Sequence, residues 1–158
     1  MSNIRLFFKE SLSLNLTATL DKSQSHYVNK VMRVKVSEVF SLFNSSGEWE
    51  AKILNISKSI VEFNITKQLR QKQSPKELWL VFSPIKSNYF NFMIQKATEL
   101  GINEINIFKS ERSSFKVDKD QLNKKKAHWN KVAIAACEQS GRTRIPKIET
   151  FQSLESLI

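Results

Sequence analysis

A short polar segment of this 158-residue chain brings together side chains that could contact a ligand. Residues 110–114 read Ser-Glu-Arg-Ser-Ser and place hydroxyls, a carboxylate and a guanidinium within five positions. Such groups suit contacts with an anion or a ribose. An ordinary polar loop closed by a Glu111–Arg112 ion pair would give the same pattern. We therefore treat Ser110, Glu111 and Arg112 as candidate site residues, with both interpretations open.

Three further candidates, Glu99, Glu138 and Arg142, lie at the ends of two predicted helices. Lys96 and Glu99 are three positions apart, so a surface ion pair is the simplest expectation for Glu99. Residues 138–142 read Glu-Gln-Ser-Gly-Arg and end the second helix. Because a helix C-terminus attracts cations, Arg142 either complements that dipole or supports a ligand or a neighbouring loop. The spacing decides neither alternative, and it names no catalytic base.

Basic residues near the N-terminus form a second kind of candidate site. The guanidinium of arginine grips a phosphate with two hydrogen bonds, which lysine cannot do, so Arg5 and Arg33 stand out beside Lys30 and Lys35. The whole chain carries 25 Lys+Arg against 15 Asp+Glu, a formal charge of +10 and a pI near 9.8. This balance favours a nucleic-acid partner. Scattered surface charge that serves solubility is the alternative.

Several classes of protein are excluded by composition. One cysteine rules out an internal disulfide framework, and His26, His128 and Cys137 are too far apart in sequence to suggest a zinc site. No stretch approaches the roughly 18 consecutive apolar residues of a membrane span, and the N-terminus lacks the apolar core of a secretion signal. We expect a cytoplasmic protein that binds neither membrane nor metal.

The first part of the chain predicts a small β-rich unit. Asp21 is expected to cap a short helix that runs to Met32, in which Tyr27, Val28 and Val31 fall at helical spacing. The segments 38–43, 48–56 and 60–66 alternate and are separated by turn residues, which is typical of an antiparallel meander. Two shorter strands are expected at residues 4–8 and 17–20. The polar stretch 69–76 contains a proline and is predicted to be a linker.

The pattern then changes to alternating strands and helices. The apolar run 78–82 predicts a strand buried on both faces, and strands are also expected at 104–109 and 147–151. Helices are predicted from about residue 88 to Gly101, from about 120 to Gly141, and from residue 153 onward. This βαβαβ order favours a parallel sheet.

Ligands of such open sheets bind beyond the carboxyl ends of the strands. There the sequence places residues 83–87 after the first strand and 110–114 after the second. The first of these loops contains no glycine, which argues against a dinucleotide or glycine-loop methyl-donor site at that position.

Five segments occur together in a recognisable order: 4–7, 26–35, 95–101, 110–113 and 138–142. In these segments the chain resembles the RsmE-type 16S ribosomal RNA uridine-N3 methyltransferases. The resemblance implies a PUA-like RNA-binding β-barrel at residues 1–68, a linker at 69–76, and the first βαβαβ part of a SPOUT, or α/β-knot, domain at 77–158. The fold class is therefore mixed α+β and α/β.

The resemblance also implies an activity. Members of this family transfer a methyl group from S-adenosylmethionine to N3 of a uridine in 16S ribosomal RNA of the small subunit, and they generally act as homodimers. On this basis Arg5, Lys30, Arg33 and Lys35 are expected to hold RNA. Ser110, Glu111, Arg112 and residues 138–142 are expected to line or brace the catalytic cleft, with Glu99 as a further candidate.

The chain departs from the family pattern in its C-terminal part. The glycine-rich knot loops, which build the family's methyl-donor pocket, are missing, and the chain contains three glycines with no two close together. We therefore expect most donor-binding residues to lie beyond Ile158, and we expect this chain alone not to bind S-adenosylmethionine. A catalytically silent RNA-binding module, or an assembly module whose incomplete sheet docks a partner chain, are the alternative functions.

Overall fold

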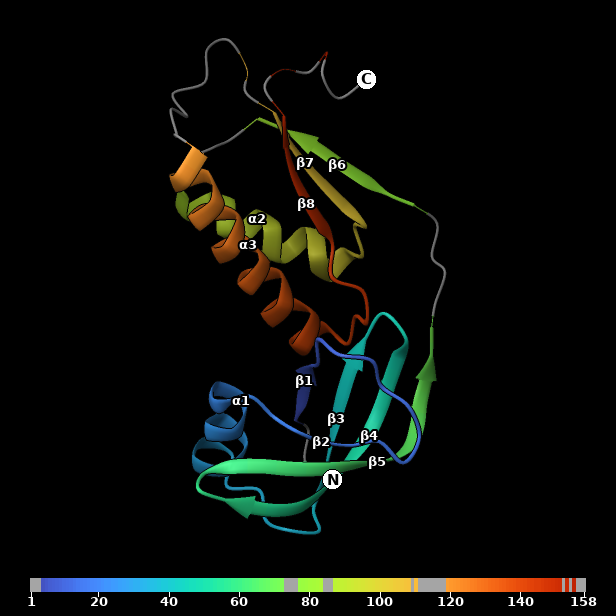
Figure 1. Ribbon diagram of the computed structural model, residues 1–158. Helices are drawn as coiled ribbons and strands as arrows, with labels where there is room; N and C mark the ends of the chain where they lie inside the picture. The colour runs from blue at the N-terminus through green and yellow to red at the C-terminus, as the bar shows by residue number, and fades with distance from the viewer. Residues whose placement is uncertain are drawn as a thin grey trace. The chain divides into compact units, whose positions relative to one another are not determined.

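The computed structural model describes residues 4–72, 77–83, 87–108, 110, 119–151, 153 and 155. The chain divides into two compact units, Met1–Gln73 and Ser74–Ile158, which are coloured blue to green and green to red in Figure 1. Most of the helix predicted from residue 153 onward lies outside the described residues.

The first unit is built on a five-stranded sheet in the order β1-β3-β4-β5-β2. Its strands β3, β4 and β5 pair antiparallel, which confirms the predicted meander, whereas β1 pairs parallel with β3. This parallel pairing could not be predicted from local sequence patterns, because it joins segments more than 30 positions apart. The strands are β1 (Arg5–Phe7), β2 (Thr17–Thr19), β3 (Val39–Asn44), β4 (Gly47–Ser57) and β5 (Ile60–Gln71).

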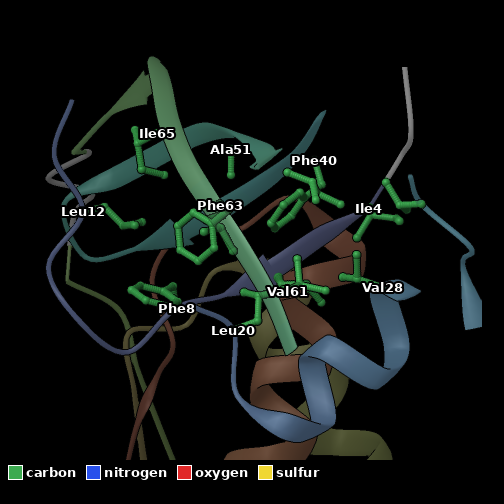
Figure 2. Packing of buried hydrophobic residues seen from close by; sticks show 14 residues of the cluster. Ile4, Phe8, Leu12, Leu20, Val28, Phe40, Ala51, Val61, Phe63 and Ile65 are labelled. Atoms are coloured by element: carbon green, nitrogen blue, oxygen red, sulfur yellow. The ribbon is translucent and has the colours of Figure 1, made fainter. Parts of the chain in front are cut away.

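Aromatic rings organise the core of this unit (Figure 2). Phe63 packs edge-on against Phe8 and Phe40, with ring centroids 5.4 and 5.9 Å apart. Edge-to-face packing of this kind adds about 0.5–1.5 kcal/mol per pair beyond burial. Val28 and Val61 are fully buried in the same cluster, so the short helix is held against the sheet.

That helix consists of two parts, α1 (Lys22–His26) and the π-helical turn η1 (Tyr27–Val31). Asp21 caps α1 as predicted, since its carboxylate accepts a hydrogen bond from the Gln24 N–H at 2.8 Å. Tyr27, Val28 and Val31 do not share a buried face, however. Only Val28 is buried, and the other two are exposed. The predicted helix is thus present, but its wider π turn alters the phase of the side chains.

The predicted linker also begins too early. Strand β5 continues through Gln71, and its last residues pair with the start of β4, Arg70 opposite Glu48 and Gln71 opposite Gly47. The polar side chains of 69–71 suit this position because the end of β5 is exposed. Residues 69–71 therefore belong to the first unit's sheet.

The second unit is a parallel three-stranded sheet in the order β6-β7-β8, joined by two helices, as the βαβαβ pattern predicts. Helix α2 ends before Gly101, and α3 ends before Gly141, at the predicted stops. The elements are β6 (Trp79–Phe82), α2 (Ser87–Leu100), β7 (Glu104–Phe108), α3 (Lys119–Ser140) and β8 (Lys147–Phe151).

Both helices of this unit cover the same face of the sheet (Figure 1). Phe90 of α2 and Trp129 of α3 stack with centroids 4.5 Å apart, and they share one core with Ile105 and Ile107 of β7. The expectation that β6 is buried on both faces is wrong for this structure. Trp79 is 54% exposed because its side chain alternates away from the helices.

Asn106 is an exception within β7. It alternates with Ile105 and Ile107, so its side chain points away from the face that α2 and α3 cover. The side chain is nevertheless fully buried, and neither its amide nitrogen nor its amide oxygen has a hydrogen-bond partner. Buried polar groups are rarely left in this state, because each unpaired group costs about 1–3 kcal/mol.

Candidate functional site

The carboxyl edge of the second unit's sheet carries a pair of hydroxyl groups. Ser83 directly follows β6 and Ser110 follows β7, and their Oγ atoms lie 3.0 Å apart. A serine hydroxyl both donates and accepts, so this pair has spare capacity for a polar ligand. The position matches the edge at which open α/β sheets bind ligands. Glu111 and Arg112, the other candidates of this loop, lie outside the described residues.

Ser83 was missed as a candidate site residue in the sequence. The signal was available, because Ser83 is the first residue after the apolar run that forms β6. Ser83 has no charged residue next to it in the sequence, whereas Ser110 is followed by Glu111 and Arg112. The short distance between Ser83 and Ser110 follows only from the pairing of β6 with β7.

The remaining candidates lie at the opposite edge of this sheet. Helix α2 runs back from the carboxyl end of β6 and ends at Leu100, just before β7 begins, so Glu99 lies near the amino edge. Helix α3 returns in the same way, which places Glu138 and Arg142 before β8. The structure therefore brings Glu99 and Arg142 together but separates them from Ser110.

Arg142 contacts the C-terminal end of α2. Its Nε donates to the backbone carbonyl of Glu99 at 3.0 Å. The guanidinium lies so close to Gly101 that a Cβ at this position would approach Arg142 Nη1 to 2.8 Å. Gly101 also has φ +89, which favours glycine. Of the two alternatives for Arg142, support of a neighbouring segment is the one that the structure shows.

The Glu99 carboxylate is held by its own helix. Lys96 Nζ donates to Oε2 at 2.7 Å and Gln95 Nε2 donates to Oε1 at 2.9 Å, which confirms the expected ion pair. These contacts, that of Lys96 first, lower the pKa of Glu99 below its ordinary value of 4.5. A carboxylate with a lowered pKa is a weaker proton acceptor. The contacts of the Glu99 carboxylate therefore fit a structural role better than that of a general base.

Arg5, predicted to hold RNA, is engaged within the first unit. Its Nε donates to Glu48 Oε1 at 3.0 Å, and its guanidinium lies 3.8 Å from the centre of the Phe43 ring. Arg70 Nε donates to the other oxygen of Glu48 at 2.7 Å. Only 11% of the Arg5 side chain is exposed, so little of its surface is left for a ligand. The arrangement indicates that Arg5 ties β1 to β4.

Lys30, Arg33 and Lys35 are exposed at this unit's helical corner. They lie within six positions on η1 and the loop after it, and no Asp or Glu occurs anywhere from residue 22 to 37. Arg33 has φ +54, a conformation uncommon in residues other than glycine. We call Lys30, Arg33 and Lys35 the basic loop. Its side chains are accessible for contacts with phosphates.

Other expectations concern metals and membranes. Among the described residues, no three His, Cys, Asp or Glu side chains are grouped so that they could hold a metal ion. In the same part of the chain, no helix combines the length and the apolar character needed to cross a bilayer. Cys137 is buried, and its thiol donates to the Arg144 carbonyl at 3.4 Å, as expected of a structural cysteine.

Two family models match the chain in succession. The model described as an RNA methyltransferase PUA domain matches residues 20–66, and the model described as an RNA methyltransferase domain matches residues 72–158. The second match alone covers more than half of the chain.

Individual relatives agree with these matches. The chain is 35% identical to ribosomal RNA small subunit methyltransferase E of Buchnera aphidicola from Schizaphis graminum, over 92% of this chain and 60% of the relative. It is 31% identical to the Rickettsia conorii protein of the same name, over 98% and 62%. A crystal structure of the Neisseria gonorrhoeae enzyme bound to S-adenosyl methionine superposes with a TM-score of 0.80 at 29% identity, over 94% of this chain and 62% of that one.

The chain thus spans about three-fifths of the length of the curated relatives that it matches. Within that span the resemblance noted in the sequence is confirmed, since family models, relatives and solved structures all agree. By the match over residues 72–158, and by the PUA-like and methyltransferase-type folds of its two units, the chain belongs to the RNA methyltransferase domain family, and it is similar to ribosomal RNA small subunit methyltransferase E.

Proposed function

We propose that this chain acts in the S-adenosylmethionine-dependent methylation of uridine N3 in 16S ribosomal RNA. The observation that carries the proposal is the succession of a PUA domain match and an RNA methyltransferase domain match on one chain. The relatives' name supports a ribosomal RNA substrate, and the Neisseria gonorrhoeae structure supports S-adenosylmethionine as the donor. The small ribosomal subunit as partner, a cytoplasmic location and a homodimer are parts of the same proposal.

The carboxyl edge of the second unit's sheet fits part of such a donor. S-adenosylmethionine supplies a methyl group on a sulfonium, and it carries ribose hydroxyls, an ammonium and a carboxylate but no phosphate. The lack of a glycine-rich phosphate cradle is therefore compatible with this donor, and the Ser83–Ser110 hydroxyl pair offers polar contacts of the right kind. Glu111 and Arg112, which follow Ser110 in the sequence, remain predicted members of this set.

The RNA must present its uracil in a particular state. N3 of uracil is a weak nucleophile while it carries its proton, so a base or a cationic environment must stabilise the anion as that proton leaves. The uracil must also be turned out of any base stack to reach the donor. The basic loop, Lys30, Arg33 and Lys35, would hold the flanking phosphates. Glu99 and Arg142, at the opposite edge from Ser110, would brace the sheet and take no part in the proton transfer.

A catalytically silent RNA-binding module is the second candidate function. The observation that favours it is the exposed basic loop on the unit that the PUA domain model matches, because contacts with RNA phosphates need no methyl donor. In this alternative the first unit binds RNA through the basic loop, and S-adenosylmethionine is not bound.

One experiment separates the two functions. The chain is incubated with S-adenosylmethionine and 16S ribosomal RNA that lacks the modification, and the RNA is digested and analysed by mass spectrometry for 3-methyluridine. Its formation supports the methylation proposal. RNA binding without product, together with no heat of donor binding by calorimetry, supports the silent module. Absence of RNA binding contradicts both.

The RNA arm has an internal control. Neutralising one phosphate contact to single-stranded RNA changes the slope of log K against log salt by about 0.7. We expect Arg33→Ala to reduce the slope by about this amount. Lys67→Ala should leave it unchanged, because Lys67 Nζ is already neutralised by Glu50 Oε2 at 3.3 Å. Equal effects of the two substitutions would remove the basic loop from the proposal.

A further inference from the structure

Three apolar side chains are exposed at the π-helical turn of the first unit. Tyr27 is 37% exposed, Val31 56% and Met32 44%. The backbone N–H of Met32 donates to the Tyr27 carbonyl at 2.9 Å, an i→i+5 bond that places these two residues one turn apart on the same side. We call Tyr27, Val31 and Met32 the apolar platform.

The platform is exposed because two other valines anchor the segment. Val28 is fully buried among the core residues shown in Figure 2, and Val34 is 5% exposed. The Val34 N–H donates to the Val28 carbonyl at 3.1 Å, which ties the loop back to the turn. Because Val28 and Val34 point into the core, Tyr27, Val31 and Met32 face solvent. The π turn thus leaves these three side chains exposed, and π turns often occur at functional sites.

The charged residues nearest to the platform in the sequence are basic. Lys30 lies between Tyr27 and Val31 in sequence, and Arg33 directly follows Met32. No acidic residue occurs from residue 22 to 37, and the Glu38 carboxylate that follows accepts a hydrogen bond from the Lys35 backbone N–H at 2.7 Å. An aromatic ring with an adjacent apolar side chain, flanked by cations, has the composition of a single-stranded nucleic-acid site.

We propose that an unpaired base of single-stranded RNA stacks on Tyr27 and Met32 while Lys30 and Arg33 hold the phosphates on either side of it. This inference deepens the proposed function and rests on its RNA-binding part. It adds the residues that recognise the base and the strandedness of the RNA. A duplex cannot satisfy the platform, because its base faces are covered by neighbouring bases.

The charge pattern also favours RNA over a protein partner. Protein interfaces are depleted of lysine at their centres, whereas here Lys30 separates two platform residues in sequence. Phosphate backbones place a negative charge at every nucleotide, so alternating apolar and basic side chains match a stacked base with its two phosphates.

Fluorescence anisotropy with the full chain tests this inference. The probes are a labelled uridine-rich single strand and the same strand annealed to its complement. Base–aromatic stacking is worth about 1–3 kcal/mol per base by alanine substitution, which corresponds to about 5- to 150-fold in affinity. We expect Tyr27→Ala to weaken single-strand binding by a factor in this range and Tyr27→Phe to retain it. Leu14→Ala is the matched control, because Leu14 is 57% exposed on the same unit and has no cationic neighbours in sequence.

Salt dependence distinguishes stacking from a structural effect or a charge effect. Tyr27→Ala should lower affinity without changing the salt slope, whereas Lys30→Ala should reduce the slope by about 0.7. Circular dichroism confirms that each variant is folded. Should Tyr27→Ala be unfolded, Met32→Ala takes its place.

The outcomes separate the inference from the proposed function. Wild-type binding to the single strand with no loss in Tyr27→Ala overturns the inference and leaves the proposed function standing. Equal affinity for the duplex and the single strand also overturns it. A change in self-association with unchanged RNA affinity would assign the platform to a second copy of the chain instead. No RNA binding by the wild-type chain overturns both.

Discussion

Replacing Glu48 with glutamine should destabilise the first unit far more than the same change at Glu50. The Glu48 side chain is 9% exposed, and its two oxygens accept from Arg5 and Arg70. Glutamine keeps the shape and one acceptor, but it turns an amide N–H₂ group toward a guanidinium that also donates. The change therefore removes the negative charge between two arginines without opening a cavity.

The magnitude follows from the exposure of the partners. Removing one member of a buried ion pair costs about 3–5 kcal/mol. After the substitution Arg5, whose side chain is 11% exposed, keeps a charge that is largely buried. The Arg70 side chain is 41% exposed, so water can solvate its charge. Because solvent offsets part of the Arg70 contribution, we expect a loss of about 2–4 kcal/mol for Glu48→Gln. For Glu50→Gln we expect about 1 kcal/mol or less, since its partner Lys67 is 56% exposed.

The assay must report the first unit separately, because the chain has two units. Urea unfolding of the chain labelled with fluorotryptophan, followed by fluorine NMR, provides this. Trp49 lies in β4 and reports the first unit, while Trp79 and Trp129 report the second. Substitution of each tryptophan by phenylalanine assigns the signals.

A double-mutant cycle with Arg5→Met identifies the cause of the loss. If the charge of Arg5 causes it, the two substitutions together should cost less than their sum by about 1 kcal/mol or more. Equal losses for Glu48→Gln and Glu50→Gln, or additive losses in the cycle, would refute the reasoning.

Two further predictions concern the second unit. Asn106→Val should raise its free energy of unfolding by about 1–2 kcal/mol, because it removes a buried amide whose atoms have no hydrogen-bond partner; a lower midpoint in urea would contradict this. The hydrogen bond from Lys126 is the main cause that lowers the pKa of Glu149 below 4.5, so the folded unit binds fewer protons there than the unfolded chain. That contribution to stability is present above about pH 4.5 and is lost as the pH falls through the folded pKa. The thermal unfolding midpoint of Glu149→Gln should therefore depend less on pH in this range than that of the wild type. An unchanged pH profile would refute this prediction.

The local elements of this chain could be predicted because local residues determine them. The strand at 147–151 and the helix ends before Gly101 and Gly141 follow from alternation, periodicity and the positive φ that glycine allows. The Asp21 cap and the Lys96–Glu99 pair depend on residues three positions apart. Spacing in the sequence is sufficient for such contacts.

The features that could not be predicted depend on pairing at a distance. The Glu48 cluster exists because β1, β3, β4 and β5 align, and the β4–β5 ladder shifts its register between Glu48 and Trp49. The exposure of Trp79 depends on the order of the strands, since two right-handed crossovers in the order β6-β7-β8 place both helices on one face. The π turn at Tyr27 widens a helix whose sequence has ordinary helical spacing.

Strand direction decides which of the family's motifs can act together. The segments 95–101 and 138–142 are both helix ends, and in a parallel βαβ unit each helix ends at the amino edge of the sheet. The segment that begins at Ser110 follows a strand and lies at the carboxyl edge. The contact between Arg142 and Gly101 therefore gives a structural reason for the first two motifs to occur together. If the proposed function holds, its catalytic base should therefore be sought at the carboxyl edge of the sheet, where the Ser83 and Ser110 hydroxyls lie 3.0 Å apart.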